Sequence, residues 1–121
     1  MTREHYAGVM SGTSLDGVDA VVADFAAAPG RVCETLGSAH IAFPRELRAI
    51  LAALQSSGPD ELARAAAVSI ALADLYAEAI LAACADARID ASTLVASGVH
   101  GQTVRHRPDL ADRAGGAFDG V

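Results

Sequence analysis

A short hydroxyl-rich turn lies between two apolar runs near the start of the chain. It reads Ser11-Gly12-Thr13-Ser14, and two carboxylates, Asp16 and Asp19, follow it three positions apart. Glycine lets backbone N–H groups approach an anion closely, and hydroxyl groups add further donors. A carboxylate beside a bound phosphate could hold Mg²⁺, which prefers one or two carboxylates together with phosphate oxygens. The pattern is therefore compatible with a phosphate-binding turn and also with a plain β-hairpin, which uses the same residue types.

Other chemistries of such a turn do not fit the sequence. A P-loop requires a lysine, and all 9 basic residues of the chain are arginines. A nucleophile elbow places its serine between a strand and a helix, whereas Ser14 is followed by Leu-Asp-Gly and a valine-rich run at 18–22. The Gly-Thr-Ser triplet of subtilisin-like proteases opens a helix, which the same run disfavours. We therefore do not assign Ser14 as a nucleophile.

A second polar stretch begins at His100, at the end of a predicted buried strand over 93–101. Ligands of α/β folds bind outside strand ends. Gln102 and Thr103 could orient sugar hydroxyls, Arg105 or Arg107 could grip a carboxylate, and a histidine could transfer a proton. A polar surface loop is the alternative interpretation. His100 and His106 do not by themselves indicate a metal site, because no further ligand cluster is visible in the sequence.

The hydrophobic pattern predicts the elements that position these residues. Apolar runs at 5–10, 17–25 and 31–43, separated by turn residues, predict a β-meander. Helical spacing predicts one helix after Pro44, and a second that starts at 58–61 and runs to about Arg88. The many alanines of the second helix indicate close packing. Its predicted buried face comprises Leu62, Ala65, Ala66, Ser69, Leu72, Ala73, Tyr76, Ile80 and Ala83.

Composition limits the classes of function. The chain has 121 residues, 52% hydrophobic and 20% charged, which suits one small globular domain. A net charge of −6 without a basic run argues against nucleic acid or an anionic membrane as the main partner. Cys33 and Cys84 are predicted to be buried free thiols, and His5 and His40 to be structural. Charged residues interrupt the stretch 60–88, so we expect a cytoplasmic protein without a membrane span.

The two polar stretches together carry a resemblance to a known family. The segment GVMSGTSLDGVDA at 8–20 resembles the nucleotide-binding turn of anhydro-N-acetylmuramic acid kinases. The segment SGVHGQTVRHRP at 97–108 resembles that family's His-Gly-Gln-Thr segment, and the two occur in the family's order. The family belongs to the actin/Hsp70/sugar-kinase superfamily. The resemblance therefore implies an α/β fold, an RNase H-like (actin-like ATPase) first lobe, present incompletely over residues 1–108.

The resemblance also implies an activity and its ligands. Members of the family use ATP and Mg²⁺ to hydrolyse the 1,6-anhydro ring of anhydro-N-acetylmuramic acid and phosphorylate it to N-acetylmuramic acid 6-phosphate, in peptidoglycan recycling. The complete kinase is expected to form a homodimer and to have no nucleic-acid or membrane partner. The implied ATP-binding residues are Gly12, Thr13, Ser14, Leu15, Asp16, Gly17, Val18 and Asp19, with Asp16 and Asp19 near Mg²⁺. The implied substrate-binding residues are His100, Gly101, Gln102 and Thr103.

The sequence departs from the family's pattern in its length and its last residues. Family chains are several-fold longer, and their general base, an aspartate in an Asp-Phe-Arg-type segment, has no counterpart here. Residues 109–121 resemble a divergent tail, such as a frameshift or an early stop would produce. We therefore expect a truncated chain that contains no catalytic residue and is inactive alone. The alternatives are a non-catalytic nucleotide- or sugar-binding fragment, a fragment that pairs with a separately encoded second lobe, and a decayed gene product.

Overall fold

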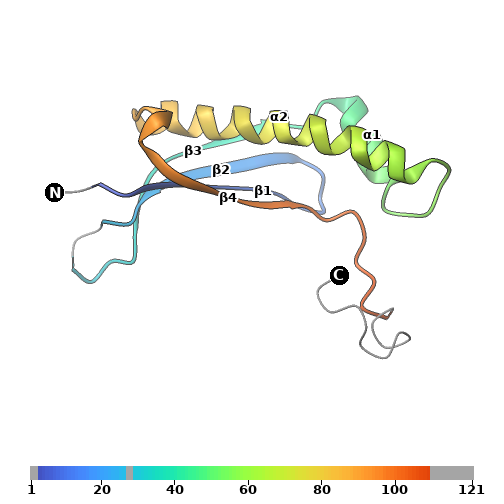
Figure 1. The fold of residues 1–121 in the computed structure, drawn as a ribbon, viewed down its shortest axis with the longest axis horizontal. Coiled ribbons are helices and arrows are strands. Elements are labelled where there is room, and N and C mark those ends of the chain that lie inside the picture. The colour runs from blue at the N-terminus through green and yellow to red at the C-terminus, as the bar shows by residue number, and fades with distance from the viewer. Residues whose placement is uncertain (1–2, 27–28, 110–121) are drawn as a thin grey trace.

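A four-stranded mixed sheet with a long helix on one face forms the body of the molecule (Figure 1). The computed structural model describes residues 3–26 and 29–109. The strands β1 (His5–Ser11), β2 (Gly17–Asp24) and β3 (Glu34–Ala42) are joined in antiparallel order, which confirms the predicted meander. The last strand, β4 (Leu94–Gln102), pairs parallel with β1. The prediction that this strand is buried is wrong, because β4 lies at the edge of the sheet and none of its residues is fully buried. The order across the sheet is β3-β2-β1-β4.

Two α-helices and one short 3₁₀ helix connect β3 to β4. The helix α1 (Arg45–Ala53) begins directly after Pro44, and α2 (Glu61–Ala87) follows it. The left-handed backbone of Arg88, with a φ of 57°, ends α2 where the sequence predicts. The 3₁₀ helix η1 (Ala91–Thr93) then leads into β4. This succession of elements confirms the α/β class and agrees with an incomplete actin-like first lobe.

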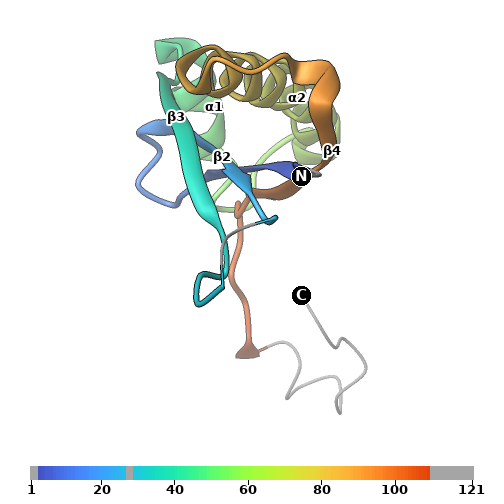
Figure 2. The ribbon, with the colours of Figure 1, turned by 90° about the vertical axis from the view of Figure 1, so that its left-hand side faces the viewer.

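The core lies between α2 and one face of the sheet (Figure 2). Alternate residues of β1 and β2 face the helix, as the period of two in a strand requires. Small residues let the two layers approach closely. Ala79 and Ala83 are fully buried, and a Cβ added at Gly37 would lie 2.5 Å from the backbone nitrogen of Ala87. The predicted role of the alanines in close packing is therefore confirmed.

The predicted buried face of α2 is partly wrong. Leu72, Tyr76 and Ala83 are buried as expected. Four residues of the predicted face are exposed, namely Leu62, Ala66, Ser69 and Ala73. Three buried residues of α2 lie outside the predicted face, namely Val68, Ala79 and Cys84. The helix is apolar around most of its circumference, so its hydrophobic pattern does not locate the buried stripe. The sheet covers a narrower stripe, in which residues recur every three or four positions.

The composition of α2 also bears on the expected absence of a membrane span. An 18-residue window in α2 has a mean hydropathy of 1.7, so the helix is long and apolar enough to cross a membrane. The charged residues of α2 therefore do not by themselves exclude a span, and the expected absence of one stays a prediction. One helix of this kind is weak evidence, because the core helix of a globular domain passes the same test. In this structure α2 packs against β1, β2 and β3.

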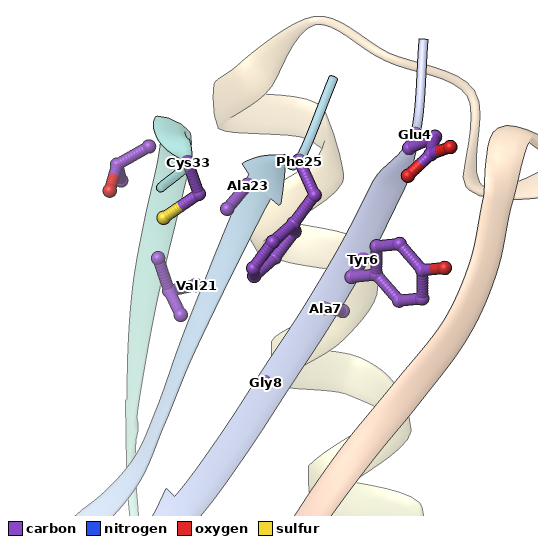
Figure 3. A pocket seen from close by; sticks show the side chains of 9 residues that line it. Glu4, Tyr6, Ala7, Gly8, Val21, Ala23, Phe25 and Cys33 are labelled. Atoms are coloured by element: carbon purple, nitrogen blue, oxygen red, sulfur yellow. The ribbon is translucent and has the colours of Figure 1, made fainter. Parts of the chain in front are cut away.

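The opposite face of the sheet carries no second layer among the described residues (Figure 2). Figure 3 shows Tyr6, Val21, Phe25 and Cys33 on this open face, directed away from the helix. The rings of Tyr6 and Phe25 meet edge to face with centroids 5.3 Å apart, beside a shallow apolar hollow of about 510 Å³. Both cysteines are free thiols as predicted, but only Cys84 is buried, and Cys33 is half-buried on this face.

Candidate functional site

The hydroxyl-rich turn connects β1 to β2 and presents polar groups to solvent. Thr13, Ser14 and Asp16 are exposed, whereas Leu15 is buried in the core. Leu15 adopts a left-handed φ of 57°, and its N–H donates to the carbonyl of Gly12 over 3.2 Å. The buried leucine thus anchors a tight turn whose hydroxyl and carboxylate groups point outward. Such a turn can surround an anion with donors.

Gly17 is required by the start of β2. Its φ is 153°, and an added Cβ would lie 2.2 Å from the carbonyl oxygen of Ile41 on β3. The next residue, Val18, is fully buried against the helix. The predicted ATP-binding range therefore contains two kinds of residue. Gly12, Thr13, Ser14, Asp16 and Asp19 are accessible to a ligand, and Leu15, Gly17 and Val18 shape the turn from below.

Two hydrogen bonds hold the base of the turn. Ser11 Oγ lies 2.8 Å from the hydroxyl of Tyr76 on α2, and this pair is buried. On the other side, Gln102 Nε2 donates to the carbonyl of Gly12 over 3.2 Å. The parallel pairing of β1 with β4 sets Ser11 opposite Gln102. The structure therefore brings the two polar stretches together at one end of the sheet, although about 90 residues separate them.

His100 lies on the open face of the sheet, away from the hydrogen bond of Gln102. It lines a hollow of about 800 Å³ that also includes Met10, Asp19 and His40. His40 Nδ1 is 2.8 Å from Asp19 Oδ1, so His40 is a neighbour of the site that sequence reasoning treated as structural. The register of β2 with β3 creates this pair, and no sequence spacing signals it. His5 is structural as predicted, buried with Nδ1 2.8 Å from Thr93 Oγ1.

The arginines of the second stretch are already paired. Arg105 contacts both carboxylate oxygens of Glu61 at the start of α2, at 2.6 and 3.2 Å. Its hydrogen bonds hold the pKa of Glu61 below the ordinary value. Arg107 likewise contacts Asp109, at 2.9 and 3.0 Å. The suggestion that these guanidinium groups grip a ligand carboxylate has little support, because each already binds a carboxylate of the chain through two of its five N–H donors.

A polar hollow of about 330 Å³ lies where the two stretches meet. Its lining comprises Thr13, Gln55, Thr103, Val104, Arg105, His106 and Arg107. The exposed hydroxyl of Thr13 stands on one side, and the segment after β4 forms the other. This hollow and the one beside His100 both open near the turn. The end of the sheet that carries the turn is therefore the candidate site.

The donor set suits a magnesium ion that arrives with a nucleotide. Among the described residues, no group of three or more His, Cys, Asp or Glu side chains could hold a metal. Asp16 and Asp19 are exposed carboxylates, at the end of the turn and on the first part of β2. Mg²⁺ binds through one or two carboxylates, water and substrate phosphates. These residues thus fit a nucleotide-bound Mg²⁺ better than a dedicated metal cage.

Comparison with known proteins identifies the family. The family model described as anhydro-N-acetylmuramic acid kinase matches residues 4–115. The chain belongs to the anhydro-N-acetylmuramic acid kinase family. The curated anhydro-N-acetylmuramic acid kinase of Bordetella petrii is 51% identical over 105 residues, which is 87% of this chain and 27% of the relative. Those of Variovorax paradoxus and Cupriavidus pinatubonensis are 50% and 44% identical, over 95% and 93% of this chain.

The chain spans less than a third of the length of these anhydro-N-acetylmuramic acid kinases. It covers 27% to 30% of the three relatives. The family match extends to residue 115, and residues 110–121 lie outside the described part of the structure. The predicted division into a lobe at 1–108 and a divergent tail at 109–121 therefore stays a prediction.

Proposed function

We propose that this chain is the nucleotide-binding front part of a kinase of anhydro-N-acetylmuramic acid. The complete enzyme would use ATP to open the 1,6-anhydro ring with water and to phosphorylate the sugar. One observation carries the assignment, namely the contact between Gln102 and Gly12, which joins the turn at 12–19 to the segment at 100–103. Membership of the family supplies the reaction. A cytoplasmic location and a homodimer of the complete kinase are part of this proposal.

The turn provides the nucleotide side of the proposed site. Its backbone N–H groups and the hydroxyls of Thr13 and Ser14 would surround the phosphates of ATP, and Asp16 and Asp19 would hold the accompanying Mg²⁺. The ion would neutralise charge on the phosphates when bound. Exposure of these side chains and the tight backbone of the turn support this assignment.

The segment His100 to Thr103 provides the sugar side. His100 opens onto the hollow that also contains Asp19 and His40. Thr103 lines the polar hollow that also includes Thr13. The turn and the segment at 100–103 would together set the sugar hydroxyl next to the terminal phosphate. Positioning of this kind supplies much of the rate enhancement in phosphoryl transfer.

Catalysis of phosphoryl transfer requires more groups than the described residues of this chain supply. Phosphoryl transfer is accelerated by groups that surround the reacting atoms from several directions. The described residues form one side of such a site and leave the sheet face beside it open. We therefore expect the 121-residue chain alone to form no N-acetylmuramic acid 6-phosphate. Product formed from ATP and the anhydro sugar above a buffer blank would contradict this part of the proposal.

Titration of the ¹⁵N-labelled chain with Mg²⁺-ATP tests the nucleotide assignment. We expect amide shifts confined to the turn and to the segment at 100–103. Gly12→Val should abolish them, because its side chain would occupy the space next to the backbone that a bound phosphate needs. A Cβ at Gly12 meets no protein atom closer than Ser14 Oγ at 3.8 Å, so we expect the variant to fold. Ser69→Ala, on the exposed side of α2, is the control. A shift pattern that Gly12→Val leaves unchanged would remove the turn from the site.

A further inference from the structure

The carboxamide of Gln102 makes two hydrogen bonds to backbone carbonyls. Its Nε2 donates to Gly12 over 3.2 Å and to Thr103 over 3.0 Å, and the side chain is partly buried. Carbonyl oxygens only accept hydrogen bonds, so the amide must direct its NH₂ group toward them. A side chain at this position therefore needs two donors in order to join the turn to the segment after β4.

An irregularity of β4 places Gln102 at this point. Val9 pairs with Val99, but Ser11 pairs with Gln102, so β4 gains one residue relative to β1. Gly101, with a φ of 84°, absorbs the change in direction. Bulges of this kind redirect a side chain near a functional site. The regular ladder would not set the amide of Gln102 against the carbonyl of Gly12.

The other end of the same amide has no partner within the described chain. Gln102 Oε1 is buried and accepts no hydrogen bond there. A buried acceptor without a partner is unfavourable, so the orientation is held by the two donated bonds. Ser11 is fixed from the opposite side by Tyr76. The first residues of the turn are thus held between α2 and β4.

We propose that Gln102 is a positioning residue that sets the shape of the phosphate-binding turn through the carbonyl of Gly12. It acts on the nucleotide side of the site, although it belongs to the segment that forms the sugar side. The identity of the ligand, Mg²⁺-ATP, rests on the proposed function, whereas the hydrogen bonds of Gln102 are features of the structure itself. If Gln102 has this role, the turn at 12–19 and the segment at 100–103 form one unit. A change at Gln102 would then alter nucleotide binding although Gln102 does not contact the nucleotide.

Gln102→Glu tests the proposal because its effect depends on pH. The introduced carboxylate has no donor and faces two carbonyl oxygens, which raises its pKa. At about pH 7.5 we expect displaced amide signals in the turn and Mg²⁺-ATP binding about tenfold weaker than in the unaltered chain. At about pH 5.5 a protonated carboxyl has one donor again. The ratio of the Mg²⁺-ATP affinities of the variant and the unaltered chain should then return toward one. Comparing variant and unaltered chain at each pH removes the effect of other titrating groups.

Two further variants control the test. Gln102→Met has a similar length and no donor at any pH, so it should show the displacement at both pH values. Ser97→Ala, at an exposed position of β4, removes a hydroxyl and leaves both hydrogen bonds of Gln102 in place, so the turn signals should not move. If Gln102→Glu does not fold at the higher pH, the comparison of Gln102→Met with Ser97→Ala still measures the effect of the donor.

The outcomes separate this inference from the proposed function. Turn signals of Gln102→Met and Gln102→Glu that coincide with those of the unaltered chain would overturn the inference. A displacement in Gln102→Glu that persists unchanged at a pH where the ¹³C shift of the carboxyl shows it to be protonated would also overturn it, because the loss would then not depend on a donor. The amide signals of the turn in Gln102→Glu could move at pH 7.5 and recover at pH 5.5 while the unaltered chain does not bind Mg²⁺-ATP. That result would support the positioning role of Gln102 and contradict the nucleotide assignment.

Discussion

Asp19 and His40 face each other across β2 and β3 on the open face of the sheet, with Oδ1 of the aspartate 2.8 Å from Nδ1 of the histidine. Asp19 is the last residue of the candidate nucleotide turn and a proposed magnesium ligand. His40 therefore contacts one of the two carboxylate oxygens that could bind the ion. Both side chains are at least half exposed. Their contact therefore matters more for the orientation of the carboxylate than for the stability of the fold.

Removal of the His40 side chain should have little effect on stability. We expect His40→Ala to lower the free energy of unfolding by less than about 1 kcal/mol, because exposed pairs are screened by water. Urea denaturation followed by far-UV circular dichroism measures the change. A loss of more than about 2 kcal/mol would show that the pair supports the fold rather than orients Asp19.

Gly17 should tolerate no side chain. We expect Gly17→Ala to destabilise the fold by about 2–3 kcal/mol, because its φ of 153° is unfavourable for alanine and the Cβ would lie 2.2 Å from the carbonyl oxygen of Ile41. Gly98→Ala is the matched control, since its nearest neighbour is 4.0 Å away. The midpoints of urea unfolding of the two variants give the comparison. Equal midpoints would mean that the start of β2 can shift away from β3.

The buried pair of Ser11 and Tyr76 should act as a unit. Tyr76→Phe leaves the hydroxyl of Ser11 buried without its partner, and we expect a cost of about 1–2 kcal/mol. In a Ser11→Ala background the same substitution should cost less, because no polar group is left behind. A double-mutant cycle in chemical denaturation measures the coupling. Additive effects of the two substitutions would show that the hydroxyls do not interact in solution.

The bridge between Glu61 and Arg105 should make stability depend on pH. The arginine lowers the pKa of Glu61 below 4.5, so the bridge contributes stability above that pH and loses it as the pH falls through the lowered value. Arg105→Gln should therefore reduce the drop in melting temperature between pH 7 and pH 3. High salt should have the same effect on the unaltered chain, since the pair is accessible. An identical pH dependence in both proteins would contradict a folded-state bridge.

The open face of the sheet should make the isolated chain self-associate. Phe25, 47% exposed, lies there beside Tyr6 and an apolar hollow, and exposed apolar patches promote association. We expect Phe25→Gln to reduce association in sedimentation velocity runs at several concentrations. Leu62→Gln, at an exposed position on α2, controls for the loss of one apolar side chain. If both variants associate equally, the open face is not the surface involved.

Local patterns of the sequence determined the elements and located both polar stretches. The turn residues between apolar runs predict the meander, and helical spacing with Pro44 and Arg88 predicts both helices. These features depend on residues close in sequence, where propensity and turn chemistry act. The resemblance of the segments at 8–20 and 97–108 placed the chain in its family, which the family match confirms.

Only the tertiary structure decided how these parts meet. The parallel pairing of β4 with β1 brings Gln102 to Gly12, and the register of β3 with β2 sets His40 beside Asp19. Arg105, which the sequence suggests as a ligand-binding residue, instead forms a salt bridge with Glu61, a residue far from it in sequence. Strand order, register and the buried stripe of an all-round apolar helix depend on contacts between distant segments. No local spacing encodes those contacts, because many pairings satisfy the same hydrophobic pattern and the packing of the whole domain selects one of them.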